Sequence, residues 1–467
     1  METKDRDRME ELFQWKGNPP LGSTISLALQ HLVAMIIGCV TPAIIISNVA
    51  GLDISQRILL IQASLVMSAV STLFQLFPIG RRFGAGLPVI MGISFAYLPS
   101  MQAIVGEEGG TLGVATITGA LMVGGIVAII VGIFVKKIRH FFPPIITGTV
   151  VFTIGLSLYP TAVNYMAGGA ANTYELVVEK KGLTAALVYG SWQNWLVAII
   201  TLVAVLLFNN LGKGVCKLAS ILLGMTVGYL VALCFGMISF TEIGTASWLS
   251  LPRFLPFGVH FNLAACISIG LLFAINSIQA IGDFTSTTIG GFDRYPTDQE
   301  LQSGIVAYGG LNFLTAFFGG LPTATYSQNV GIIINNKVVN RKVFTTTAIM
   351  ILLCGICPKF SAILTTIPQC VLGGATVTVF SSIAMTGMKL ITTEYLTPRN
   401  TTVVGLSAAL GVGIAQASGT LSQFPAGFTM IFGKSPVVVA TIMAVILNII
   451  LPPDEKPVAM PAEEAEE

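Results

Sequence analysis

The sequence predicts an all-α polytopic membrane protein with about 14 transmembrane segments in two groups of seven. The first observation is compositional: 54% of the residues are hydrophobic, only 10% are charged, and the mean hydropathy is +0.82. Soluble domains carry about 25% charged residues, so this chain is suited to a lipid bilayer. The second observation is that apolar runs of about 20 residues recur along the chain. The third is a matched interruption in two of these runs, half a chain apart.

The expected spans follow one another with short connections. The first group is predicted at residues 25–48, 57–78, 87–105, 112–135, 142–163, 188–208 and 217–238. The second group is predicted at residues 263–283, 303–319, 321–335, 344–366, 368–390, 400–417 and 429–451. Below, segment 3 and segment 10 denote the third span of the first group and the third span of the second group.

The distribution of Lys and Arg predicts that both termini are cytoplasmic, because cytoplasmic connections are enriched in these residues. Even-numbered connections carry basic clusters such as Arg81-Arg82 and Arg341-Lys342, whereas the loop at 106–110 carries none. The N-terminus is polar and charged, so no cleavable signal peptide is expected. The acidic tail at 452–467 is expected to remain in solvent.

Several function classes are disfavoured. Seven cysteines lie in or beside apolar runs without a CxxC pair, which favours buried free thiols over disulfides or a metal site. The formal net charge of +2 gives no indication of nucleic-acid binding. We find no intramembrane His/Asp/Glu cluster with metal-ligand spacing and no justified Ser-His-Asp set, so neither an enzyme nor a cofactor is expected.

Segments 3 and 10 share their interruption. Both contain Gly-Leu-Pro, at residues 86–88 and 320–322, and a Phe precedes each Gly by three residues (Phe83 and Phe317). Matched broken segments in corresponding halves indicate a substrate site at a repeat interface. Chance recurrence in a Gly-rich chain is the alternative, but the shared Phe and the half-chain spacing favour a repeat.

Segment 10 is too polar to face lipid, since six polar side chains occur between residues 321 and 329. Pro322 and the alternating pattern predict a few extended residues, followed by a half-helix that begins near Gln328. Such backbone persists at membrane depth only where it lines a cavity or is covered by protein. The free N–H groups of a half-helix suit a flat, carbonyl-rich ligand, and a Gln side chain both donates and accepts.

Segment 3 supplies the facing half of this site. Gly92 permits close approach of the backbone, Ser94 adds a hydroxyl, and Phe95 offers an aromatic face for stacking. Taken alone, Phe95 would be interpreted as core or lipid packing. Its position opposite Gln328 in the repeat favours a role in the site.

Polar side chains in the first and eighth spans are further candidates, because polar groups are costly inside a bilayer. Gln30 and His31 lie in the first span, where His31 is a proton-linked group, a substrate ligand or an inter-helix strut. Gln279 and Asp283 are four residues apart and share one face of the eighth span. Asp283 is the only acidic side chain deep in any predicted span, which makes it a candidate proton carrier. The alternative is that it holds a neighbouring backbone segment or His31 in place.

Together these motifs resemble the signature of the nucleobase–ascorbate transporter family, and most closely its xanthine and uric acid permease group. The stretch 328–337 begins Gln-Asn-x-Gly and ends in a basic residue, as the signature does, although Asn336 stands where Thr is usual. The other matching motifs, which follow in the same order along nearly the whole chain, are Gln30-His31, Ser94-Phe95 and Ile281-Gly282-Asp283.

The resemblance implies two inverted seven-span repeats, with core and gate domains, and usually a homodimer. It implies a permease of the cell inner (cytoplasmic) membrane that moves a purine nucleobase by an elevator-type shift of the core, coupled to a proton or sodium ion. The implied parts are a cytoplasmic segment 1–24, core residues 25–135 and 263–366, gate residues 136–262 and 367–451, and the cytoplasmic tail 452–467.

Carried over residue by residue, the resemblance gives each candidate a role. Phe95 would stack on the base, Gln328 and the backbone near Ser327 would hydrogen-bond its edge, and Asn329 would brace the broken segment. A Gln at position 328 is typical of purine members, whereas uracil members tend to have Glu. The substrate-binding candidates are Ser94, Phe95, Gln279, Ser327 and Gln328, and the supporting or coupling candidates are Gln30, His31, Asp283 and Asn329.

Two positions depart from the family pattern. Gln279 stands where a Glu usually serves as ligand and proton site, and Tyr308 stands where xanthine members often have Asp. Because an amide cannot titrate, the proton relay is either moved to Asp283 and His31 or absent. The leading prediction is a permease for a purine such as xanthine or uric acid. The alternatives are a uracil or other nucleobase permease, an anion exchanger or channel of the same general fold, and a membrane enzyme in third place.

Overall fold

The computed structural model describes residues 10–138, 143–169, 188–238, 240, 243–244, 246–417 and 419–452. Within them the protein is mostly helical, and strands β1 (Met91–Ile93) and β2 (Thr323–Thr325) form one two-stranded sheet. Nearly all of the predicted acidic tail, and the start of the predicted N-terminal segment, lie outside the described residues.

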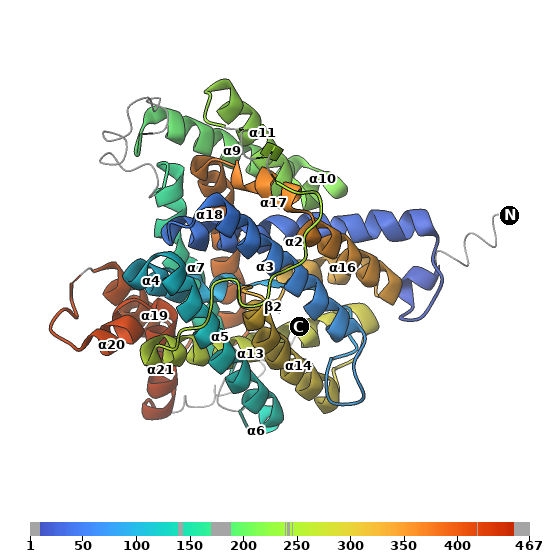
Figure 1. The fold of residues 1–467 in the computed structure, drawn as a ribbon. Helices are drawn as coiled ribbons and strands as arrows, with labels where there is room; N and C mark the ends of the chain where they lie inside the picture. Colours follow the sequence, from blue (N-terminus) through green and yellow to red (C-terminus); the bar gives the residue numbers. More distant parts are fainter. Residues whose placement is uncertain are drawn as a thin grey trace, which may run out of the picture.

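The long helices of the first half follow the predicted order, with boundaries within a few residues of those expected (Figure 1). They are α2 (Leu21–Val49), α3 (Ile54–Leu76), α4 (Leu98–Glu108), α5 (Gly110–Ile133), α7 (Pro144–Met166), α9 (Trp192–Leu211) and α11 (Ser220–Cys234). Short helices lie between or before them: η1 (Glu11–Phe13), η2 (Phe95–Tyr97), α6 (Val135–Ile138) and α10 (Val215–Leu218).

The helices of the second half correspond to those of the first. They are α13 (Leu263–Phe292), α14 (Asp298–Phe317), α15 (Ser327–Asn336), α16 (Arg341–Ile356), α17 (Pro358–Thr365), α18 (Gln369–Ile391), α19 (Pro398–Gln416), α20 (Ala426–Phe428), the π-helical turn η6 (Thr429–Gly433) and α21 (Pro436–Ile450).

Two of these elements differ from the sequence-based expectation. Helix α13 continues past the predicted end at 283 to Phe292 and ends at Asp293, which is left-handed. The hydroxyls in its last turns bond to the helix's own carbonyls; for example, Thr285 Oγ1 donates to the Ile281 carbonyl at 2.7 Å. The predicted span 344–366 is not one straight helix. It bends by 76° between α16 and α17, where Pro358 has no N–H for a continued helix.

The two halves repeat each other with opposite direction. Helix α5 packs on α14, and the corresponding pair α16 and α3 packs in the same way; α9 with α11 corresponds to α19 with α21. The equivalent strands β1 and β2 pair antiparallel, with Met91 opposite Thr325 and Ile93 opposite Thr323. The predicted fold of two inverted seven-segment repeats is therefore confirmed.

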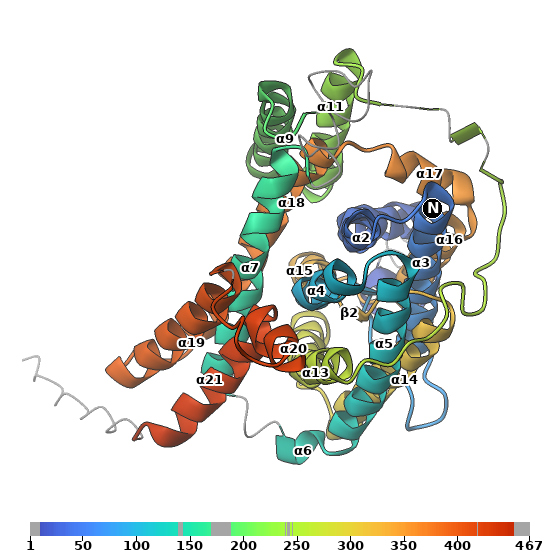
Figure 2. The ribbon, with the colours of Figure 1, turned by 60° about the vertical axis from the view of Figure 1, so that its left-hand side comes forward.

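The helices gather into two bundles (Figure 2). The first bundle contains α2–α5, α13–α16 and the two strands, and the second contains α7, α9, α11, α18, α19 and α21. Within the second bundle α7 and α18 pack along their lengths, because small residues face each other. A Cβ added to Gly155 would lie 2.4 Å from the Ala384 nitrogen, and one added to Gly387 would lie 2.2 Å from the Phe152 nitrogen.

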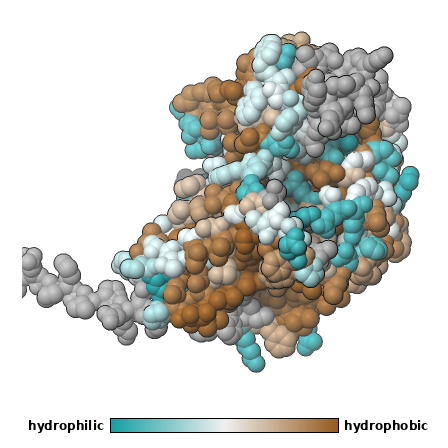
Figure 3. Space-filling view, turned by 90° about the vertical axis from the view of Figure 1, so that its left-hand side faces the viewer, coloured by the Kyte–Doolittle hydropathy of each residue, from teal (hydrophilic) through white to brown (hydrophobic). Residues whose placement is uncertain are grey.

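Apolar surface covers much of the molecule, as expected in a bilayer. Seven helices of the described residues are long and apolar enough to cross a membrane, and the bent pair α16–α17 would be an eighth span. The remaining segments are shorter or more polar helices or, in segments 3 and 10, interrupted. Figure 3 shows broad hydrophobic areas on one face, separated by a paler polar strip.

Basic connections between the spans meet on one face of the molecule, called the basic face below. Lys136 pairs with Asp298 at 2.7 Å, and Lys337 pairs with Asp293 at 3.1 Å. Gln299 joins the loop before segment 3 by donating to the Arg81 carbonyl at 2.9 Å. The connections that were predicted to share one side of the membrane are therefore neighbours in the fold.

Candidate functional site

The two broken segments meet in the interior of the first bundle. Outside the paired strands, the Ser94 N–H donates to the Pro322 carbonyl and the Tyr326 N–H donates to the Ile90 carbonyl, both at 3.0 Å. The extended residues predicted in segment 10 are therefore present, and they pair with the equivalent residues of segment 3. Because this pairing satisfies backbone groups that are buried from water, the interruption is compatible with the membrane interior.

Two buried polar side chains hold the outer edges of this ribbon, and the sequence analysis did not identify either. The Met91 N–H donates to Thr72 Oγ1 at 3.0 Å. Asn312 accepts the Thr323 N–H at 2.8 Å and donates to the Thr323 carbonyl at 3.0 Å. Thr72 and Asn312 lie on α3 and α14, which are equivalent helices of the two repeats, so the ribbon is supported symmetrically.

The backbone at Gly92 is approached by a ring of the protein itself. A Cβ added to Gly92 would lie 2.3 Å from an atom of the Tyr326 ring, and the Tyr326 hydroxyl donates to the Ile93 carbonyl at 2.8 Å. Gly92 therefore allows the Tyr326 ring to cross β1. The close approach predicted at this glycine is made by Tyr326.

Asp283 anchors the start of α15. One carboxylate oxygen accepts the Ser327 hydroxyl at 2.7 Å, and the other accepts the Thr325 hydroxyl. The carboxylate is 8% exposed and ties α13 to the end of β2 and the first residue of α15. Of the alternatives given by the sequence, this contact matches the holding of a neighbouring segment, while His31 bonds elsewhere.

His31 is fully buried and pairs with Asn329 on α15. Asn329 Nδ2 donates to the His31 carbonyl at 3.0 Å and lies 3.1 Å from His31 Nδ1. The imidazole packs on the Phe344 ring at 4.7 Å, and its Nε2 has no hydrogen-bond partner in the described part of the chain. Gln30 beside it is half-buried and makes no hydrogen bond to a described residue.

Two carboxamides remain free at the edge of the ribbon. Gln328 is exposed in the first turn of α15, and Gln279 is half-buried one turn before Asp283 on α13; neither bonds to another described residue. The Asp283 carboxylate links the two positions, since it is one turn from Gln279 and bonds the residue before Gln328. These amides and the α15 N-terminus are available to a polar, planar ligand.

The segment 3 candidates lie beside the second bundle. Phe95 is 8% exposed and meets Phe380 of α18 edge-on, with ring centroids 5.3 Å apart. The Ser94 hydroxyl accepts the Ala96 N–H at 3.2 Å, which caps the short helix η2. Phe95 therefore stands where the two bundles face each other.

Tyr308 belongs to a buried hydrogen-bond network. Its hydroxyl bonds the Tyr97 hydroxyl and accepts from Asn276 Nδ2, the latter at 3.1 Å. Tyr97 and Tyr308 are fully buried, and the network joins η2, α13 and α14. At the position where the family resemblance implied an Asp, this chain therefore has a hydroxyl that joins three elements.

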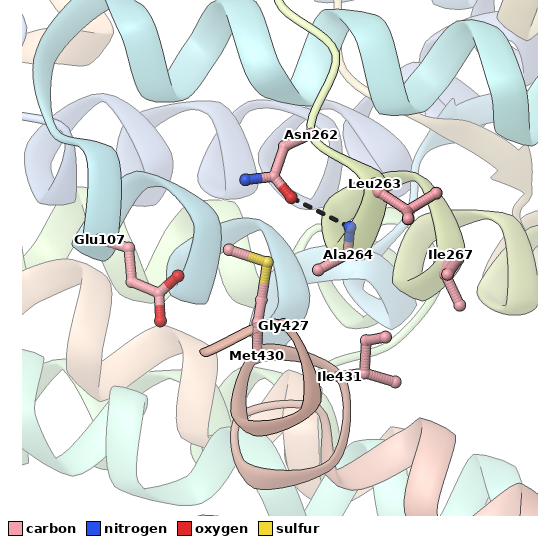
Figure 4. Close-up of a pocket in the computed structure, with 8 residues that line it drawn as sticks. All are labelled: Glu107, Asn262, Leu263, Ala264, Ile267, Gly427, Met430 and Ile431. Atoms are coloured by element: carbon pink, nitrogen blue, oxygen red, sulfur yellow. Dashed lines mark hydrogen bonds between the residues drawn. The ribbon is translucent and has the colours of Figure 1, made fainter. Parts of the chain in front are cut away.

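A separate cavity of about 380 Å³ lies away from the ribbon, at the contact of α13 with η6 (Figure 4). Its lining is mostly apolar: Leu263, Ala264, Ile267, Gly427, Met430 and Ile431, with Glu107 and Asn262. The Asn262 side chain caps α13 by accepting the Ala264 N–H at 3.0 Å. In the described ranges no group of three or more His, Cys, Asp or Glu could hold a metal ion.

Comparisons with known proteins give consistent results. A family model, Xan_ur_permease, described as a permease family, matches residues 22–420. A xanthine permease of Bacillus subtilis is 30% identical over 437 residues, covering 92% of this chain and 94% of its own length. The uric acid permease PucK of the same organism is 31% identical over 424 residues, covering 90% and 94%.

Solved structures show the same fold at low sequence identity. The transmembrane domain of a cyanobacterial bicarbonate transporter, BicA, is 16% identical with a TM-score of 0.53, covering 91% of this chain and 97% of that domain. The murine anion transporter Slc26a9 is 11% identical with a TM-score of 0.58, covering 95% and 70%. At these identities the likeness concerns the fold.

Proposed function

The chain belongs to the permease family of nucleobase–ascorbate transporters, and from this premise we propose that it carries a purine such as xanthine or uric acid across the cytoplasmic membrane. It is a transport protein rather than an enzyme. The observation that carries the proposal is the pair of unbonded carboxamides, Gln279 and Gln328, beside the exposed N-terminus of α15.

The proposed pose follows from the chemistry of these groups. A purine dione presents alternating N–H and C=O groups along its edge, and each carboxamide both donates to and accepts from such an edge. Ser327 lies at the same helix start, where free N–H groups and partial positive charge favour carbonyl oxygens. Phe95 would cover one face of the purine ring, with Ser94 beside it. The bond between Asn329 and His31 would hold α15 against α2.

Coupling is proposed to run through Asp283, because Gln279 cannot carry a proton. Asp283 accepts hydroxyls from β2 and α15, so a change in its protonation would alter the support of Ser327 and of the neighbouring Gln328. His31 is the second candidate, since its Nε2 is buried without a partner among described residues. The coupling ion in this proposal is a proton, with sodium as the alternative.

We also propose that the first bundle is the mobile core and the second bundle the gate, with the boundaries expected from the sequence. In an elevator movement the core, with the ribbon, shifts against the gate and exposes the site to either side. The basic face is then cytoplasmic, as are both termini, and the gate forms the contact of a homodimer in the bilayer.

The test is binding to the purified protein. Xanthine and uric acid should raise the melting temperature, whereas uracil, sulfate and bicarbonate should not, because a ligand stabilises the form to which it binds. Stabilisation by uracil alone would favour a pyrimidine permease, and stabilisation by the inorganic anions alone would favour an anion exchanger.

The variant Gln328→Ala should lower purine affinity by at least about tenfold, because two hydrogen bonds to the base are lost. The matched control is Gln416→Ala, an exposed Gln at the end of α19 with no hydrogen bond to a described residue. Equal affinity in the two variants, measured by calorimetry, would remove Gln328 from the site.

A further inference from the structure

We propose that contacts between α4 and the start of α21 form a latch that seals the substrate passage on the face opposite the basic face. The latch consists of Ser100 and Glu107 on α4, with Lys434 and Ser435 before α21. The sealing role, though not the contacts, rests on the proposed transport function. With the latch closed, the passage is open at α15, toward the basic face.

The buried part of the latch is the contact of Ser100 with Ser435, and Ser268 lies behind it. Ser100 Oγ and Ser435 Oγ are 2.8 Å apart, and Ser268 Oγ donates to Ser100 Oγ at 3.1 Å. All three are at most 2% exposed. Ser100 and Ser268 belong to the first bundle, and Ser435 precedes α21 of the second, so the bond between Ser100 and Ser435 crosses directly between the bundles.

The outer part of the latch is the ion pair of Glu107 and Lys434, which lies next to Ser435 in the chain. Both side chains are about one-third to two-fifths exposed, so the pair alone contributes little. Figure 4 shows Glu107 on one side of the cavity, with Met430 and Ile431 on the turn of η6. Packing of η6 and α21 on α13 continues this contact, so the bundles meet closely here.

The equivalent helix of the other repeat makes no such contact. Helix α15 bonds to the first bundle, through Asn329 to His31 and Ser327 to Asp283. In the described part of the chain it makes no hydrogen bond to the second bundle, and Ser327 and Gln328 are exposed. The two repeats therefore differ at this point. Helix α4 is bonded to the second bundle, whereas α15 makes no bond to it among the described residues.

A transporter of this architecture alternates between two arrangements, and contacts present in one arrangement shift the balance toward it. Removing the latch should therefore favour separation of α4 and α13 from α21. Loss of one bundle-crossing hydrogen bond and one exposed ion pair should raise the open fraction on that side about three- to tenfold.

The experiment places one reporter cysteine on each side. Ser268→Cys reports the latch side, because this residue is buried behind Ser100. Gly331→Cys reports the α15 side, because a Cβ at Gly331 has no atom within 4 Å. Reaction of each thiol with a water-soluble maleimide is measured in the purified, ligand-free protein in nanodiscs, and peptide mass spectrometry separates these thiols from the native cysteines.

The latch variant is Lys434→Gln with Ser435→Ala, which leaves the Ser100 hydroxyl in place. The latch-side reporter thiol should react about three- to tenfold faster in this variant, while the α15-side reporter thiol should react no faster. The control is Lys337→Gln, which removes an exposed ion pair inside the first bundle and should change neither rate. The charge exchange Glu107→Lys with Lys434→Glu should keep the latch-side thiol slow.

An unchanged rate at the latch-side reporter thiol overturns the latch. Faster reaction of both reporter thiols also overturns it, because that pattern indicates general loosening of the fold. Because no substrate is used, the latch result is independent of whether a purine binds. A protein that fails the binding test above would disprove the proposed substrate and leave the labelling rates interpretable.

Discussion

Segments 3 and 10 have the same design and opposite surroundings. Each has Gly-Leu-Pro, a short strand and a half-helix, and the strands pair with each other. After β1 the chain forms the buried turn η2 before α4, and Phe95, Ala96 and Tyr97 are all at most 8% exposed. After β2 the chain enters α15 directly, and its first two residues are exposed.

The side chains that hold the two segments in place also differ. Segment 3 is held by hydroxyls, through Tyr97 with Tyr308 and Ser100 with Ser435. Segment 10 is held by a carboxylate and an imidazole, which Asp283 and His31 present to α15. The backbone is therefore repeated, while a buried carboxylate and a buried imidazole lie beside only the segment 10 copy among the described residues. We therefore propose that segment 3 is mainly scaffold and that segment 10 makes most of the contacts to the ligand.

The largest expected effect on stability is at the support of β2. Asn312→Ala leaves the buried N–H and carbonyl of Thr323 without partners, and each unpaired group costs about 1–3 kcal/mol. We expect the free energy of unfolding to fall by about 3 kcal/mol, seen as a lower melting temperature of the purified protein. Asn335→Ala, at an exposed position on α15, is the control; equal melting temperatures for both variants would contradict the support role.

An intermediate effect is expected where β1 passes Tyr326. Gly92→Ala places a methyl group 2.3 Å from the ring, and overpacking of this kind costs about 1–3 kcal/mol. Gly331→Ala adds the same methyl group in open space on α15, so its melting temperature should not fall. Combining Gly92→Ala with Tyr326→Leu should recover part of the loss, and no recovery would show that the ring is not the obstacle.

The smallest expected effect on stability distinguishes a scaffold residue, Tyr308, from a proposed ligand contact, Gln279. Tyr308→Phe removes one buried hydroxyl from the network with Tyr97 and Asn276, which should lower stability by about 1 kcal/mol. The additional stabilisation by a saturating purine should stay unchanged. Gln279→Ala should show the reverse pattern, with little change in stability and a weakened response to purine. Thermal shift with and without the base distinguishes the two, and a lost response in Tyr308→Phe would place Tyr308 in the site.

The order of the spans and both interruptions could be predicted from the sequence, because apolar runs, Pro and matched tripeptides are local signals. Thr72 and Asn312 could not be predicted, since their partners Met91 and Thr323 lie in other segments and no pattern marks a buried Thr or Asn as a strut. The bend at Pro358 was not predicted, because the apolar run continues through this residue and was interpreted as one straight helix.

The candidate site was predicted unevenly. Gln279 and Gln328 could be identified from the sequence because polar residues are conspicuous within apolar runs. In the structure neither amide bonds to another described residue, so both are available to a ligand. The pairing of His31 with Asn329 was not predicted, since it joins the first span to the tenth. Gln30 was expected to support the site, yet it makes no hydrogen bond to a described residue.

The pairing of β1 with β2 also has a consequence for biogenesis. During synthesis the first half enters the bilayer long before residue 323 is made, so the edge of β1 has no strand partner at that stage. The ribbon is a contact between residues far apart in sequence, and such contacts form late. We therefore expect that a nascent chain released before residue 325 would bind no base, and that insertion of the second half completes the fold.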